Sequence, residues 1–341
     1  MAAFERRVLG RIGVAASAFG IGGVGLGERL ERIEEATAVA TVDAAYDLGV
    51  RYFDTSPWYG HGLSEHRMGH VLRNRPRDDF VLASKVGRVF FRPEAPQSYR
   101  PEVWAGGLPF DYRFDYSADG IRRSYEDSLQ RLGMNRIDLL LVHDLDLRFH
   151  ETDARMDKHI ADLDAGGGWR VLADMRDRGE IRGIGFGINF TGLIPRWLEL
   201  FDPDFFLVAM PYTLLDQDAL DEDLPLCAER NVGIVIGSVY SSGILATGVS
   251  DSAVYRYGTP PAEIVEKVRG IETVCARHDV PMRAAALQFP LGHDSVAAII
   301  PGAISPEQVR ENAALMKQPI PGDFWAELKA EGLLRSDAPT P

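Results

Sequence analysis

The chain has 341 residues, 45% of them hydrophobic, which suffices for one large α/β barrel or two ordinary domains. Its formal net charge of −13 disfavours binding to nucleic acids and to anionic membranes. The two cysteines, Cys227 and Cys275, form no CxxC pair, so neither a disulfide framework nor a metal site is expected. The N-terminal segment lacks the apolar stretch of a signal peptide, and no segment is long enough to cross a membrane. We therefore expect a soluble, cytoplasmic protein.

Strands and helices alternate along most of the chain. Two short N-terminal strands precede a Gly-rich run at 20–27. Further apolar strands are predicted at 51–56, 80–86, 138–144, 181–189, 205–212, 232–240 and 295–302. Helices are predicted at 31–49, 64–74, 118–133, 169–180, 191–201, 223–231, 261–279, 281–293, 306–318 and 323–334. The stretch 87–117 is expected to be irregular, and 144–168 is expected to be a polar connection.

This alternation predicts a parallel sheet. Counted from the Gly-rich run there are eight strand and helix units, which fit a (β/α)8 TIM barrel with an N-terminal β-hairpin and extra C-terminal helices. A doubly wound sheet is the alternative, because the run 20–27 also matches GxGxxG. A run so rich in glycine satisfies that pattern easily, so the barrel is favoured. We predict one barrel domain over 1–334 and a disordered tail at 335–341.

Three polar residues stand where apolar strands end, namely Asp54, Lys85 and His143, and Tyr59 follows five residues after the first. Each alone has an ordinary explanation: a helix cap, a salt-bridge partner, a satisfied buried histidine or a loop aromatic. In a parallel barrel, however, the carboxyl ends of the strands meet at one mouth. Their joint occurrence at successive strand ends therefore indicates an active site.

Several segments resemble, in order, the motifs of the aldo-keto reductase family, and the match covers nearly the whole chain: 49–69, 83–87, 137–144, 181–189 and 299–312. The resemblance implies an NAD(P)-dependent oxidoreductase that needs no metal. It also implies a catalytic tetrad of Asp54, Tyr59, Lys85 and His143. Tyr59 would give or take the proton, with its usual pKa of about 10 lowered by Lys85. Asp54 would hold Lys85, and His143 would polarise the substrate oxygen.

By the same resemblance, the residues expected to bind the cofactor are Gly22, Gly23, Asn189, Ser238, Ser242, Pro301, Gly302, Ala303, Gln308, Glu311 and Asn312. Asn189 would bind the nicotinamide carboxamide. From the residues alone, the segment 299–312 is a loop followed by a helix that starts at Ser305. Members that bind NADP often carry Lys at the position of Gly302 and Arg at that of Gln308. NAD is therefore the preferred cofactor, with NADP open through Arg310.

Aromatic side chains are expected to line the substrate pocket, together with His143: Trp58, Phe90 and Trp104. Arg88 and Arg92 would hold an anionic group or simply be solvated. The stretches 106–133 and 143–146 resemble one subgroup, the dehydrogenases of L-fucose and other D-threo aldoses together with pyridoxal 4-dehydrogenases. The resemblance implies oxidation of a cyclic hemiacetal to a lactone, with the sugar ahead of pyridoxal.

Two other readings stay open. One is a general NADPH-dependent reductase of aldehydes or ketones, and the other is an idle barrel that binds the cofactor as a regulatory subunit. An intact tetrad disfavours the idle barrel. The expected partner is a small molecule, and a monomer or small homo-oligomer fits the sequence, which shows no long apolar repeat that demands a partner.

Overall fold

The computed structural model describes residues 4–250, 253–256 and 258–341. The first three residues, part of the N-terminal segment that shows no signal-peptide pattern, lie outside the described residues. Eight parallel strands form the central sheet in the order β12-β11-β10-β9-β8-β5-β4-β3. Their bounds are β3 Ile21–Gly22, β4 Tyr52–Asp54, β5 Val81–Val86, β8 Leu139–His143, β9 Gly183–Ile188, β10 Phe205–Ala209, β11 Gly233–Gly237 and β12 Val296–Ile299.

The sheet closes on itself. Parallel bridges join Phe19 to Ile299 and Gly22 to Gly302, so the first and last strands of the sheet are neighbours. A doubly wound sheet would stay open at both edges. The (β/α)8 barrel predicted from the alternation of strands and helices is therefore confirmed, and the doubly wound alternative is wrong.

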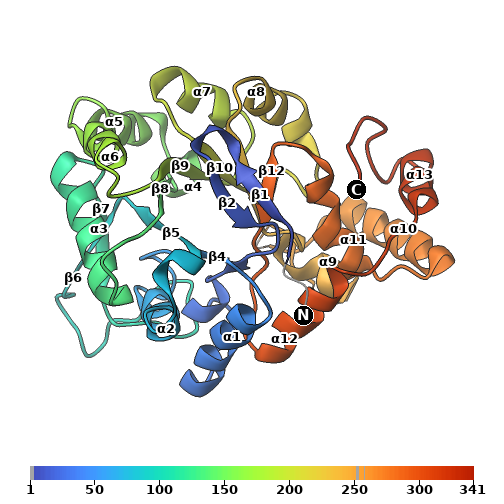
Figure 1. Cartoon of the computed structure of the whole chain (residues 1–341), viewed down its shortest axis with the longest axis horizontal. Coiled ribbons are helices and arrows are strands. Elements are labelled where there is room, and N and C mark those ends of the chain that lie inside the picture. Colours follow the sequence, from blue (N-terminus) through green and yellow to red (C-terminus); the bar gives the residue numbers. More distant parts are fainter. Residues whose placement is uncertain (1–3, 251–252, 257) are drawn as a thin grey trace.

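Helices surround the barrel (Figure 1). Those that follow the strands, with the C-terminal additions, are α1 Glu35–Asp47, α2 Leu63–Leu72, α3 Ala118–Leu132, α6 Gly168–Asp177, α7 Leu193–Leu200, α8 Asp223–Glu229, α9 Ile244–Thr247, α10 Ala262–His278, α11 Met282–Gln288, α12 Pro306–Leu315 and α13 Gly322–Ala330. Within the described part of the chain, none of the helices has the length and apolar character needed to cross a membrane.

One end of the barrel is plugged by the predicted N-terminal hairpin, whose strands β1 (Arg6–Leu9) and β2 (Val14–Ser17) cross the middle of Figure 1. Leu9 and Val14 are fully buried and pack in one cluster with the side chains inside the barrel. The hairpin meets the sheet at Gly233, the first residue of β11. The amino ends of the strands are thus covered, which leaves the carboxyl ends for chemistry.

The stretch 87–117, expected to be irregular, and the polar connection 144–168 both contain regular structure. Residues 87–117 include an antiparallel hairpin of β6 (Arg88–Phe91) and β7 (Asp111–Phe114). Residues 144–168 include the helices α4 (Leu147–His150) and α5 (Asp153–Leu163). The strands of the hairpin are short and far apart in the sequence, so neither shows a usable period of its own.

The tail 335–341, for which the sequence predicts disorder, packs on the barrel in the structure. Arg335 forms an ion pair with Asp221, and Ala338 is 1% exposed. A Cβ added to Gly292 would lie 2.7 Å from the carbonyl carbon of Thr340, so the tail backbone runs closely against this turn. The tail is short and polar, which suggested disorder, and its composition gives no sign of these tertiary contacts.

Candidate active site

A buried ion pair lies where β4 and β5 end. Lys85 Nζ is 2.7 Å from Asp54 Oδ1 and donates a second hydrogen bond of 2.7 Å to the carbonyl of Thr55. The side chains of Asp54 and Lys85 are each 1% exposed. Burial raises the pKa of Asp54, and the neighbouring Lys85 opposes that rise. The pairing of adjacent strands β4 and β5 brings the two side chains together.

Tyr59 stands over this pair. Lys85 Nζ lies 4.9 Å from the centroid of the Tyr59 ring, and the ring of His143 is 5.9 Å from it. The loop that carries Tyr59 packs directly on Gly27, where a Cβ would lie 2.5 Å from the Tyr59 carbonyl carbon. Glycine at position 27 thus permits the close approach that seats Tyr59. The structure brings all four predicted tetrad residues together at the carboxyl ends of the strands.

His143, the last residue of β8, is buried in surroundings that disfavour its charged form. Burial first, and then the cations Arg88 and Lys85, hold the pKa of His143 well below its usual value. Its Nδ1 lies 2.9 Å from Arg88 Nη1 and 3.2 Å from Ser56 Oγ. A neutral imidazole can donate one hydrogen bond to a substrate oxygen, which suits a group that polarises a carbonyl.

Of the two alternatives that the sequence left for Arg88, a solvated side chain is wrong, because Arg88 lies inside the site. Arg88 is 2% exposed, and it forms an ion pair of 2.8 Å with Asp144 Oδ2. Aromatic rings surround its guanidinium at 4.5 to 5.2 Å from their centroids: Trp58, Tyr112, Phe114 and Phe149. Arg92, in contrast, is exposed. The position of Arg88 in the sequence could have indicated its burial. Arg88 comes three residues after Lys85, directly after Gly87, and begins the apolar run RVFF.

A cavity of about 570 Å³ opens over the tetrad at this end of the barrel. Its volume suits a small molecule or cofactor site. All four tetrad residues line it, as do most of the other predicted site residues: Gly22, Trp58, Trp104, Asn189, Ser238, Ser242, Pro301, Gly302, Ala303 and Gln308. Residues that the sequence reasoning did not single out also line it, among them Arg29, Leu30, Glu31, Tyr240, Arg148 and Phe149. The first three follow the Gly-rich run, and the last two lie on the unexpected helix α4.

Four predicted site residues do not line the cavity. Gly23 donates its backbone N–H to Asp54 O at 2.8 Å and so holds the end of β4 in place. Phe90 stacks on His61 with ring centroids 5.6 Å apart. Glu311 and Asn312 both accept hydrogen bonds from Arg283, at 3.0 and 3.1 Å. Asn312 also accepts a hydrogen bond of 2.7 Å from the hydroxyl of Tyr240, which itself lines the cavity.

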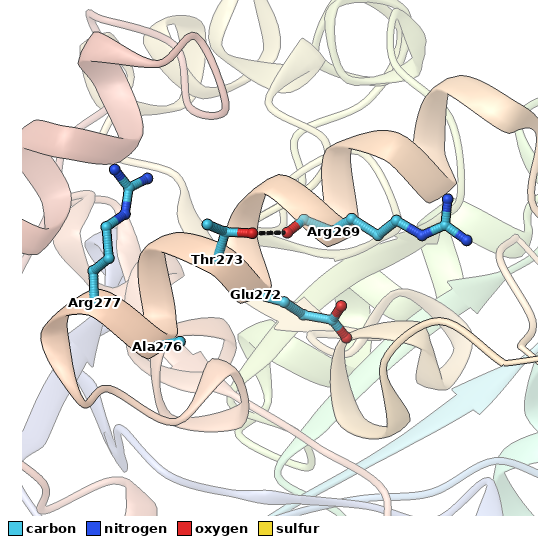
Figure 2. Close-up of a pocket in the computed structure, with 5 residues that line it drawn as sticks. All are labelled: Arg269, Glu272, Thr273, Ala276 and Arg277. Atoms are coloured by element: carbon cyan, nitrogen blue, oxygen red, sulfur yellow. Dashed lines mark hydrogen bonds between the residues drawn. The ribbon is translucent and has the colours of Figure 1, made fainter.

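A second depression lies on the outer face of α10, away from the mouth of the barrel (Figure 2). Its lining comes from one helix only: Arg269, Glu272, Thr273, Ala276 and Arg277. Arg277 forms ion pairs with Glu327 of α13 and with Glu331, the residue that follows this helix. These two ion pairs hold α13 against α10. Within the described residues no cluster of three His, Cys, Asp or Glu side chains could hold a metal ion.

Comparison with known proteins gives matches over most of the chain. A sequence model of the aldo/keto reductase family matches residues 18–331. A pyridoxal 4-dehydrogenase from Microbacterium luteolum is 41% identical over 340 residues, which cover 97% of this chain and 98% of the relative. A D-threo-aldose 1-dehydrogenase from a Pseudomonas species is 37% identical over 340 residues, covering 96% and 97%.

A solved structure shows the same fold. The holo form of an aldo-keto reductase from Bacillus halodurans matches with a TM-score of 0.76 at 24% identity and covers 98% of each chain. With a family match over most of its length, this chain belongs to the aldo-keto reductase family. It is an oxidoreductase of the kind that works with a nicotinamide cofactor and a small carbonyl or alcohol substrate.

Proposed function

We propose that the protein oxidises a cyclic hemiacetal to a lactone with NAD, using Tyr59 as the base. The observation that carries the proposal is the buried Lys85–Asp54 pair, which lies against the Tyr59 ring and next to a neutral His143 in one cavity. When bound, the nicotinamide accepts a hydride from the carbon that carries the hydroxyl. The substrate loses that hydride and one proton, and the products are lactone, NADH and a proton.

The chain's own residues manage the proton. The Tyr59 phenolate takes the hydroxyl proton, and the nearby ammonium of Lys85 stabilises that phenolate. Asp54 holds the ammonium in place through its 2.7 Å hydrogen bond. His143, which is neutral, donates a hydrogen bond to the reacting oxygen. In the reverse direction the same groups would protonate a carbonyl.

The residues that line the cavity fit a dinucleotide. Asn189 donates hydrogen bonds to Asp144 and Asp146 at 3.3 and 3.2 Å, which fixes the orientation of its amide. Its carbonyl oxygen would then accept a hydrogen bond from the nicotinamide carboxamide. The backbone of Gly302 and Ala303, Ser238, Ser242 and the N-terminus of α12 would hold the pyrophosphate and the adenosine.

The preference for NAD rests on two neutral residues at the adenosine end. Gln308 Oε1 accepts a hydrogen bond of 3.0 Å from Ile304 N, so this side chain braces the loop. Gly302 carries no side chain at all. Arg310, which the sequence left open as a phosphate ligand, forms an ion pair of 3.1 Å with Glu307 and is not among the cavity-lining residues.

Replacing Gly302 with lysine is expected to raise kcat/KM for NADP by about 10- to 100-fold, because the new ammonium would pair with the 2′-phosphate. The position tolerates a side chain, since a Cβ there would meet its nearest atom, Gly22 O, at 3.9 Å. Steady-state rates with NAD and NADP give the measurement. Gly302→Met supplies equal length without charge, and an equal gain in that variant would contradict the electrostatic explanation.

The substrate end of the cavity has aromatic walls. Trp58 meets Trp104 and Phe149 edge to face, with ring centroids 5.2 Å apart in both cases. Such walls can cover the apolar face of a sugar ring or a flat heterocycle. We propose an L-fucose-type aldose as the substrate. Pyridoxal is the second candidate, because the relative with 41% identity is named as a pyridoxal 4-dehydrogenase.

The test follows the formation of NADH and NADPH at 340 nm with L-fucose, L-galactose, D-arabinose and pyridoxal. Turnover of a sugar with NAD ahead of NADP supports the proposal, and turnover of pyridoxal alone assigns the second candidate. Reduction of simple aldehydes or ketones by NADPH, without oxidation of any of the four, would assign a general carbonyl reductase and overturn it. Mass spectrometry of the product after the reaction is quenched should identify a lactone. This distinguishes oxidation of the hemiacetal from oxidation of another hydroxyl.

A further inference from the structure

Arg88 places a cation with no acceptor atoms against the imidazole of His143. A guanidinium can only donate hydrogen bonds. Its Nη1 is 2.9 Å from His143 Nδ1, so Nδ1 must present its lone pair there. A neutral imidazole carries its single proton on the other nitrogen in that case. The geometry therefore requires that His143 be protonated on Nε2.

Asp144 favours the same arrangement from the other side of the ring. Its Oδ2 accepts a hydrogen bond of 2.8 Å from Arg88 Nη2 and lies 3.4 Å from His143 Nε2. A carboxylate beside Nε2 stabilises a proton on that nitrogen. Arg88 and Asp144 thus act together: the guanidinium faces the lone pair of Nδ1, and the nearby carboxylate favours a proton on Nε2 while that N–H stays available to the reacting oxygen.

The same carboxylate reaches toward the cofactor end. Asp144 Oδ1 accepts a hydrogen bond of 3.3 Å from Asn189 Nδ2. Asp144 directly follows β8 with a left-handed φ of 54°, a conformation that Asp tolerates better than most residues. The turn aims its carboxylate back into the site, between His143 and Asn189.

Burial of the Arg88–Asp144 ion pair has an unfavourable desolvation free energy, which suggests that the pair has a functional role. A buried ion pair is often no more stabilising than apolar residues of the same volume. The aromatic rings around Arg88 offset part of the desolvation. Resting on the proposed function, we propose that Arg88 and Asp144 are positioning residues that hold His143 as the Nε2–H tautomer and fix the amide of Asn189.

The proposal concerns the tautomer rather than the charge of His143. The groups that face the imidazole are Lys85 from β5, Arg88 from β6, Asp144 after β8, and Tyr59 and Ser56 after β4. If Arg88 were absent, Lys85 and burial would still disfavour imidazolium, whereas the unpaired carboxylate of Asp144 would favour it. Without the guanidinium, Ser56 Oγ at 3.2 Å can accept a hydrogen bond from a protonated Nδ1. Nε2 would then turn a lone pair toward the substrate oxygen.

The direct test is nitrogen-15 NMR of histidine-labelled protein, with the His143 signals assigned by their loss in His143→Gln. We expect the wild-type chain to show neutral His143 with its proton on Nε2 at neutral pH. In Arg88→Lys, which cannot bridge Nδ1 and Asp144 with two parallel donors, the Nδ1–H tautomer should appear. Proton on Nδ1 in the wild type, or an unchanged tautomer in a folded Arg88→Lys, would overturn the proposal.

Kinetics provide a second readout. Arg88→Lys should lower kcat by about 10²- to 10³-fold, because one hydrogen-bond donor to the reacting oxygen is lost, with a smaller change in KM for substrate. Added ethylguanidinium should restore part of the activity of Arg88→Ala, which a merely structural role would not predict. Arg92→Lys, an exposed position after β6, is the matched control and should keep wild-type kinetics.

The two proposals fail in different ways. If the wild-type chain oxidises none of the panel substrates, the proposed function fails, while the NMR spectrum of the wild-type chain still reports the tautomer. If the panel is oxidised but His143 carries its proton on Nδ1, the proposed function stands and the role of Arg88 and Asp144 falls. The wild-type spectrum needs no variant, so a poorly folded Arg88→Lys does not leave the idea untested.

Discussion

Tyr59→Phe is expected to lower kcat by about 10²- to 10⁴-fold while the dissociation constant of the cofactor stays nearly unchanged. The variant keeps the ring that packs over Lys85 Nζ at 4.9 Å and loses only the hydroxyl that moves the proton. Single-turnover rates with the best substrate give the effect on chemistry, and quenching of protein fluorescence gives cofactor binding.

Tyr125→Phe is the matched control for this variant. Tyr125 lies on α3, does not line the cavity, and is slightly more buried than Tyr59. It should retain wild-type turnover. Tyr59 is the group to which the tetrad assigns proton transfer. Full activity in Tyr59→Phe would therefore contradict the tetrad.

Lys85→Met is expected to abolish turnover and to lower the free energy of unfolding by about 3–5 kcal/mol. The substitution leaves Asp54 buried without its cation. Burial already raises the pKa of Asp54, and Lys85 is the group that opposes the rise. Chemical denaturation monitored by circular dichroism measures the stability, and the hydride-transfer assay measures the activity.

The pH dependence of this variant has a definite sign. With Lys85 gone, the folded-state pKa of Asp54 rises further above its unfolded value, so the folded protein binds the proton more tightly. The free energy of unfolding should therefore increase as the pH falls through the folded pKa toward the unfolded one. Adding Asp54→Asn should recover stability at neutral pH without recovering turnover. If the single variant were as stable as the wild type, the pair would contribute nothing to the fold.

The barrel, and the strand-end positions of three of the four proposed tetrad residues, could be predicted because their signals are local. Each strand is a short apolar run, and a polar residue such as Lys85 within such a run must lie near one end of it or be paired. Parallel topology then gathers those ends at one mouth. Tyr59 came from the resemblance, since a single aromatic in a loop carries no signal of its own.

The remaining site residues depend on pairing between distant segments. Arg88 reaches His143 and Asp144 only because β6 turns back and pairs with β7, and residues 92–110 separate these two strands. No local pattern shows that pairing. Phe90 was expected at the substrate because it belongs to an aromatic-rich stretch, yet its ring stacks on His61 behind the cavity. Composition indicates which residues are apolar, and only the tertiary contacts decide which of them face the ligand.

The seam between β3 and β12 has a consequence for the motions of the barrel. The seam is held by two bridges, Phe19 to Ile299 and Gly22 to Gly302, and β3 pairs with β4 along two residues, whereas β8 and β9 are paired along five residues. Local opening of the ring should therefore begin around β3, and the amides there should exchange with solvent before those of the central strands. Gly22 and Gly302 also line the cavity. A dinucleotide that contacts both residues would connect the two sides of the seam. Ligand binding should therefore reduce local opening of the barrel and slow the exchange of its amides.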